Sequence, residues 1–143
     1  MALAALWSMA FADQEHSHAK RSFGTPGKLT STARIVSVSM DDTMRFTPSE
    51  IAVKQGETVR FVVKNLGTQK HEMVLGHVAE LKSHAELMQR FPNMQHDEPN
   101  MVSVAPGAQA ELVWRFTKAG KVDFACLLPG HFEAGMRGKV SVK

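Results

Sequence analysis

Two stretches of the sequence alternate apolar and polar side chains, and a period of two is typical of a β-strand with one buried face. The stretches cover residues 58–64 and 110–116. The apolar side chains that each stretch would place on one face are Val59, Phe61 and Val63, and Leu112, Trp114 and Phe116. Six shorter strand-like segments, bounded by turn residues, cover 34–39, 50–54, 71–75, 101–104, 121–126 and 138–142. About eight short strands of this kind predict an all-β, Greek-key β-sandwich.

One segment departs from this pattern. Residues 78–91 repeat apolar side chains at the spacing of a helix, and Pro92 ends the repeat. The predicted apolar stripe is Val78, Leu81, Ala85, Met88 and Phe91. We therefore expect one helical insertion in the sandwich, at about residues 78–91.

The chain has 143 residues, enough for one domain with a substantial core. Residues 1–12 are apolar and end in an A-x-A-like cleavage site, so we interpret them as a truncated signal peptide, with an ordinary N-terminal helix as the alternative. Export would place the protein in a periplasm or outside the cell, without a membrane span in the mature chain. The polar residues 13–32 are expected to form a flexible arm that carries His16 and His18, and residues 33–143 the folded domain.

Charge and cysteine content exclude several functions. The formal net charge is +3, and no run of Lys or Arg reaches the density of a nucleic-acid-binding patch. The basic balance indicates a solvated surface, or weak steering toward an acidic partner. A single cysteine excludes an internal disulfide, a two-cysteine dinuclear copper site and a Cys₄ cluster.

The cysteine is the first of three candidate metal ligands in one short stretch of the chain. Cys126, His131 and Met136 follow one another with four residues between each pair. Thiolate, imidazole and thioether are donors that select copper. To share one ion the chain must fold back twice, which Pro129-Gly130 and Gly135 permit. A trigonal His₂Cys copper plane still needs a second histidine from elsewhere.

Placement favours His71 as that histidine. It stands at the start of a predicted strand, where a rigid sandwich can fix its geometry. The other histidines lie on the N-terminal arm, in or before the predicted helix (His77 and His84) and in the loop after it (His96).

Residues 33–143 resemble the cupredoxins, the fold of plastocyanin, azurin and rusticyanin. The resemblance rests on Asn65, His71-Glu72, Pro106-Gly107 and the stretch from Gly120 to Met136, whose Cys-x₄-His-x₄-Met spacing is similar to the rusticyanin type. It implies a type 1 copper with His71, Cys126 and His131 as equatorial ligands and Met136 as the axial one. It also implies that the Lys70 carbonyl can act as a distant fifth ligand. Glu72 stands where many members have asparagine, which leaves a blue or a green site open.

The resemblance implies electron transfer rather than catalysis, because a four-ligand site leaves little room for substrate. A cytochrome or a copper oxidase is the expected redox partner, and the protein is expected to be a monomer. We expect the ring edge of His131 to be the electron port. The apolar neighbours Leu127, Leu128, Pro129, Phe132 and Ala134 would form a docking patch around it, or would simply pack the loop.

Two alternatives remain at the level of sequence. The chain is similar to small periplasmic cupredoxins associated with copper resistance, so it is also a candidate for copper buffering or delivery. A second metal site would then use His16, His18, Met94 and His96, with Met101 nearby, although methionines also fill gaps in cores. The other alternative, a stray domain of a multicopper enzyme, is disfavoured because the expected fold contains no His-x-His pair.

Overall fold

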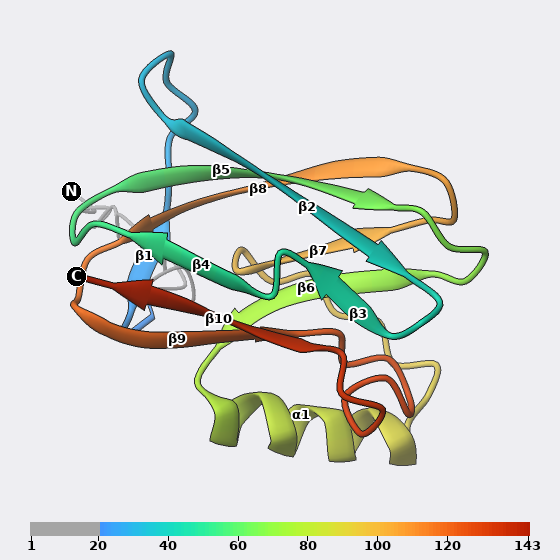
Figure 1. Ribbon diagram of the computed structural model, residues 1–143. Coiled ribbons are helices and arrows are strands. Elements are labelled where there is room, and N and C mark those ends of the chain that lie inside the picture. Colours follow the sequence, from blue (N-terminus) through green and yellow to red (C-terminus); the bar gives the residue numbers. More distant parts are fainter. Residues whose placement is uncertain (1–20) are drawn as a thin grey trace, which may run out of the picture.

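The computed structural model describes residues 21–143, which form two five-stranded β-sheets packed face to face, with one helix beside them (Figure 1). The first sheet has the order β1 (Gly24–Pro26), β8 (Gln109–Phe116), β5 (Thr58–Asn65), β2 (Arg34–Asp41) and β3 (Arg45–Thr47). The second has the order β4 (Glu50–Val53), β10 (Arg137–Val142), β9 (Gly120–Ala125), β6 (His71–Gly76) and β7 (Met101–Val104). The helix α1 covers Val78–Arg90. The predicted β-sandwich with one helical insertion is confirmed.

The core lies between the two sheets and follows the alternation in the sequence. All six apolar side chains expected to face inward from the two long strands are buried. They pack against side chains of the second sheet, including Val122, Phe124 and Val140. Burying a large apolar side chain contributes about 1.5–3 kcal/mol. This layer therefore supplies the rigid platform for the loops at its ends.

Two short strands were not predicted from the sequence. One is β3, which pairs with β2. The other is β1, whose residues lie in the segment expected to be a flexible arm and pair with β8 instead. Phe23 beside it is buried, with its ring 5.4 Å from that of Trp114. A Cβ on Gly24 would overlap the Arg115 carbonyl, so glycine allows this close approach. The ordered sheet therefore begins before residue 33, and His16 and His18 lie outside the described residues.

Helix α1 covers one side of the second sheet. Leu81, Ala85 and Met88 are buried, as expected, whereas Val78 and Phe91 at the two ends are 49% and 57% exposed. Leu81 and Ala85 belong to a second apolar cluster whose other members are Val74, Met101, Ala125, Leu127 and Phe132. The helix is thus anchored to the strands that carry the candidate metal centre. Over residues 21–143 no helix has the length and apolar character needed to cross a membrane.

Candidate metal centre

The donors found in the sequence meet at one end of the second sheet. His71 is the first residue of β6, Cys126 follows β9 and Met136 precedes β10. These strands are neighbours in the order β10-β9-β6, which brings the three residues to the same edge. The ligating atoms of His71, Cys126 and His131 all lie within 4.8 Å of one another, and Cys126 Sγ is 3.3 Å from His131 Nδ1. His131 is 8% exposed, and the other three candidate ligands are 0% exposed.

The loop from Cys126 to Met136 folds back twice. Its first turn is closed by a 3.0 Å hydrogen bond from the His131 amide to the Leu128 carbonyl. At its base, the Met136 amide donates to the His131 carbonyl and the Cys126 amide donates to the Met136 carbonyl, both at 3.1 Å. Gly130 and Gly135 take positive φ angles of 83° and 95°, a region that glycine enters readily. The backbone alone therefore holds Met136 next to the two ligands before it.

Asp42 orients His71, and sequence reasoning missed this residue. Its carboxylate comes from the turn between β2 and β3 in the opposite sheet and accepts a 3.0 Å hydrogen bond from His71 Nε2. His71 Nδ1 is buried and has no hydrogen-bond partner among residues 21–143, as expected of an atom that faces a metal. Donation of the other ring N–H to a carboxylate is the usual way in which a metal-binding histidine is held.

Asp42 is itself fixed by the segment before His71. The Thr68 amide and hydroxyl donate to it at 2.7 and 2.8 Å, and the Gln69 amide donates at 3.2 Å. These bonds, first from Thr68 and then from His71, hold the pKa of the Asp42 carboxyl well below its usual range. The carboxylate is therefore charged whenever the protein is folded near neutral pH. A Cβ on Gly67 would overlap it, which explains the glycine.

Asn65 shapes the same segment. Its side-chain amide donates to the carbonyls of Gln69 and Val104 at 2.7 and 3.0 Å and accepts a 2.9 Å hydrogen bond from the Gly67 amide. Because Asn65 is buried, losing these partners would leave polar groups unpaired. Asn65 therefore positions the loop that delivers His71.

The surroundings of Cys126 suit a thiolate only when a cation is present. Burial raises the pKa of the Cys126 thiol to about 12, and the Glu72 amide approaches Sγ at 3.4 Å. Burial, and then the neighbouring His71, lower the pKa of His131, which keeps that ring neutral. A metal must therefore displace the thiol proton, while the imidazole is ready to bind. One thiolate, two imidazoles and a buried thioether are the donor set of a copper centre, and copper fits it.

Glu72 connects the two segments that carry ligands. Its side chain is buried, and Oε1 accepts a 3.3 Å hydrogen bond from the amide of Leu127, the residue after Cys126. Ser103 Oγ lies 3.5 Å from the other oxygen. Burial raises the pKa of the Glu72 carboxyl. The Glu72 side chain thus ties the two ligand segments together.

The remaining histidines of the described chain lie away from this triad. His77 precedes helix α1 and is 3.0 Å from the Ser22 hydroxyl. His84 and His96 form a pair with ring centroids 4.3 Å apart. The structure thus gives His96 a partner that the sequence did not suggest, whereas its expected partners His16 and His18 lie outside the described residues.

Comparison with known proteins agrees with this geometry. Residues 33–143 match the profile of copper-binding proteins of the plastocyanin/azurin family. The chain belongs to this family, the cupredoxins. The expected family and its copper cofactor are confirmed. This cupredoxin is 56% identical over 129 residues to the copper-resistant cuproprotein CopI of Rubrivivax gelatinosus, with 90% of the chain and 78% of the relative covered.

Further matches are more distant. The protein of the same description from Pseudomonas aeruginosa is 38% identical over 152 residues, with 86% and 83% of the two chains covered. Among solved structures, auracyanin from Roseiflexus castenholzii superposes with a TM-score of 0.67 at 16% identity, over 78% of this cupredoxin and 98% of auracyanin. That likeness supports the fold.

Proposed function

We propose that this cupredoxin carries single electrons through a type 1 copper bound by His71, Cys126, His131 and Met136. The observation that carries the proposal is the buried His71–Cys126–His131 triad, whose members are held by hydrogen bonds from both sheets. A site built in advance by the protein changes little between oxidation states, which favours rapid electron transfer. The copper would supply the redox couple. We propose a carrier rather than an enzyme.

His131 is the proposed exit for the electron. It is the only one of the four candidate ligands with measurable exposure. The docking patch around it is smaller than the sequence suggested, because Leu127 and Phe132 are buried in the apolar cluster beneath helix α1. Pro129 and Ala134 are exposed and Leu128 is half-buried, so these three residues remain as the apolar surface next to the port.

The setting that we propose is copper tolerance in the periplasm. Support comes from the relatives, which are described as copper-resistant cuproproteins. Further support comes from the apolar residues 1–12 and their A-x-A-like end, which favour export. A cytochrome or a copper oxidase in that compartment is the kind of partner that a small one-electron carrier would serve, and we propose that it acts as a monomer.

An optical titration tests the centre itself. Copper added to the apo-protein should produce an intense visible thiolate-to-copper band at one equivalent, and Cys126→Ser should abolish it. His77→Asn is the matched control and should leave the band unchanged, because His77 lies outside the triad. A band that survives in Cys126→Ser would overturn the assignment of the ligands.

Electron exchange needs a separate measurement. Stopped-flow oxidation of the copper-loaded protein by a small redox protein should be slowed by more than tenfold in His131→Gly. Leu29→Ala is the control, because Leu29 is 60% exposed and lies outside the segments that carry or position the ligands, and it should slow the reaction negligibly. Unchanged exchange in copper-loaded His131→Gly would exclude His131 as the port.

Copper buffering or delivery is the second candidate, and the description of the relatives favours it. Under this reading a further copper ion binds at His16 and His18 of the N-terminal segment. Equilibrium dialysis of the full chain distinguishes the two roles. If His16→Ala/His18→Ala binds one copper equivalent fewer than the unmodified chain, copper handling by this segment is supported. An unchanged copper count would exclude a copper site in this segment.

A further inference from the structure

Two half-buried histidines outside the type 1 centre have buried ring nitrogens without hydrogen-bond partners. His84 lies in helix α1 and His96 in the loop that follows it, and their ring centroids are 4.3 Å apart. Within residues 21–143 neither His84 Nε2 nor either ring nitrogen of His96 has a hydrogen-bond partner. Three such nitrogens in one place are a feature that requires an explanation.

Leaving these nitrogens unpaired is unfavourable. A buried polar group without a hydrogen bond costs about 1–3 kcal/mol. Burial lowers the pKa of both imidazoles, and the neighbouring His96 lowers that of His84 further. The two rings are therefore neutral near pH 7 and keep lone pairs that can bind a metal.

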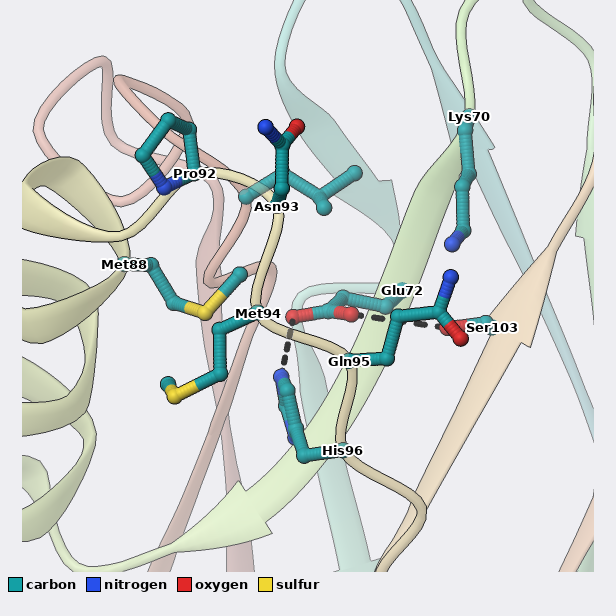
Figure 2. Close-up of a pocket in the computed structure, with 10 residues that line it drawn as sticks. Lys70, Glu72, Met88, Pro92, Asn93, Met94, Gln95, His96 and Ser103 are labelled. Carbon is teal, nitrogen blue, oxygen red and sulfur yellow. Dashed lines mark hydrogen bonds and ion pairs between the residues drawn. The ribbon is translucent and has the colours of Figure 1, made fainter.

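Two thioethers accompany the two imidazoles. Met88 follows His84 by four residues, so both side chains lie on the same face of helix α1. Met94 precedes His96 by two residues in the loop. Met88, Met94 and His96 line one cavity of about 370 Å³. In Figure 2 the side chains of Met88 and Met94 lie on the helix side of the Glu72 carboxylate, which a dashed line joins to the His96 ring.

Charged groups of both signs surround the pair. The carboxylate of Glu72 lies 3.9 Å from His96 Nε2, and Glu98 lines a smaller cavity together with His84 and His96. Lys70 also borders the larger cavity, where its charge opposes that of Glu72. Glu80 lines the smaller cavity as well, and so does Arg21, which lies 3.3 Å from Glu98 and offsets its charge. Three carboxyl groups against one ammonium and one guanidinium leave only a small negative balance, so the unpartnered imidazole nitrogens, rather than the net charge, are the reason to expect a metal here.

We propose that His84, His96, Met88 and Met94 form a second copper site, selective for Cu(I). Imidazole with thioether is a soft donor set that suits Cu(I), whereas zinc sites use thiolate, imidazole and carboxylate ligands. The site is built by helix α1 and the loop after it and shares no ligand with the type 1 centre. It does not depend on electron transfer at that centre, nor on the histidines of the N-terminal segment.

The test uses the full chain with His16→Ala and His18→Ala, so that the N-terminal histidines cannot contribute. One equivalent of Cu(I) first fills the type 1 centre. A second equivalent is then titrated without oxygen against a chromophoric Cu(I) chelator, while the methionine methyl groups are followed by carbon-13 NMR. We expect the second equivalent to bind and to shift the methyl signals of Met88 and Met94, while those of the core residues Met40 and Met73 stay in place.

Variants locate the ligands. His84→Leu and His96→Leu should each weaken binding of the second equivalent of Cu(I) by at least about tenfold. Binding of the first equivalent should not change. Met88→Leu, which conserves volume, should act in the same direction, and His77→Asn is the matched histidine control. Binding of the first equivalent shows that each variant is folded, and if a histidine variant does not fold, Met94→Leu and the methyl signals carry the test.

Three results would overturn the site. The first is the absence of a second bound equivalent. The second is binding that leaves the Met88 and Met94 methyl signals unmoved. The third is equal affinity for Zn(II) at the same ligands. None of these results would affect the visible band of the type 1 centre, so the failure of this site and the failure of the proposed electron carrier are distinguishable.

Discussion

At the scale of single residues, Asp42 and His71 depend on each other across the two sheets. They are 29 positions apart in the chain, and the hydrogen bond between them joins the β2–β3 turn to the start of β6. The sequence predicts the cysteine, histidine and methionine of the ligand loop because they follow one another at a fixed spacing. It contains no such signal for Asp42, because the contact depends on how the two sheets pack.

Replacing Asp42 tests this support. In Asp42→Asn the amide has less charge with which to hold His71, so copper affinity should fall by about ten- to a hundredfold. Chelator competition on the apo-protein measures the change. Asp41→Asn is the neighbouring control and should alter affinity by less than about twofold, because Asp41 bonds to Thr43 within its own turn. Equal affinities of Asp42→Asn and the unmodified protein would show that His71 is held by packing alone.

At the scale of elements, strands with a clear period were predictable and short strands were not. In β5 and β8 every second side chain faces the core, so the alternation of apolar and polar residues can be seen in the sequence. β1 and β3 have three residues each, too few for any period to show. Helix α1 was predictable from its apolar residues at helical spacing. That spacing carries no information on how the loop after the helix folds, so the pairing of His84 with His96 was missed.

The helix offers a comparison between two leucines. Leu81 is buried in the cluster beneath the helix, whereas Leu87 is 40% exposed. Leu81→Ala should lower the free energy of unfolding by about 2–5 kcal/mol through lost burial and the resulting cavity. Leu87→Ala should lower it by less than about 1 kcal/mol. Urea unfolding of the apo-proteins measures both values, and similar losses for the two variants would mean that the helix does not depend on this cluster.

The ion pair between β5 and β8 gives a pH dependence. Arg60 Nε donates to Glu111 at 2.9 Å, and this bonding lowers the pKa of the Glu111 carboxyl. A carboxyl whose pKa is lowered by folding stabilises the folded state above its unfolded pKa of about 4.3. That contribution is lost as the pH falls through the lower, folded pKa.

Glu111→Gln should therefore be less stable than the unmodified protein at pH 7, and the difference should shrink as the pH falls below about 4. Urea unfolding across this range provides the measurement. Glu50→Gln is the control, because its carboxylate pairs with Lys139 while being 71% exposed, and it should change stability little at any pH. A difference for Glu111→Gln that is constant with pH would rule out the ion pair as its cause.

At the scale of the whole molecule, the candidate copper centre connects parts that are distant in sequence. Its ligands come from β6, the end of β9 and the loop before β10, and Asp42 adds the opposite sheet. The β-sandwich was predictable from the alternation of its strands. The gathering of His71, Cys126 and His131 was predictable from the spacing of the ligand loop, the placement of His71 at a strand and the resemblance to the copper family. The hydrogen bonds that orient the ligands were not, since they depend on the packed structure.

Removal of copper should therefore weaken the whole domain. A ligand that binds only the folded state stabilises it by about 4 kcal/mol when its free concentration is a thousand times its dissociation constant. Thermal unfolding with and without one equivalent of copper should show a higher melting temperature for the loaded protein. Cys126→Ser should show a much smaller shift, and an equal shift in this variant would place the stabilising ion elsewhere.

Because the donor atoms are buried, the proposed electron exchange and the exchange of the copper ion should occur on different timescales. The proposed electron transfer needs only a ring edge near the surface, and the ring of His131 is 8% exposed. An ion needs a gap as wide as itself, and the backbone hydrogen bonds that join Cys126, His131 and Met136 close that gap. Copper can therefore leave only when this loop opens locally, an event governed by the stability of the loop rather than by the strength of the copper bonds alone. In the electron-carrier role that we propose, many electrons would pass during the residence of one ion.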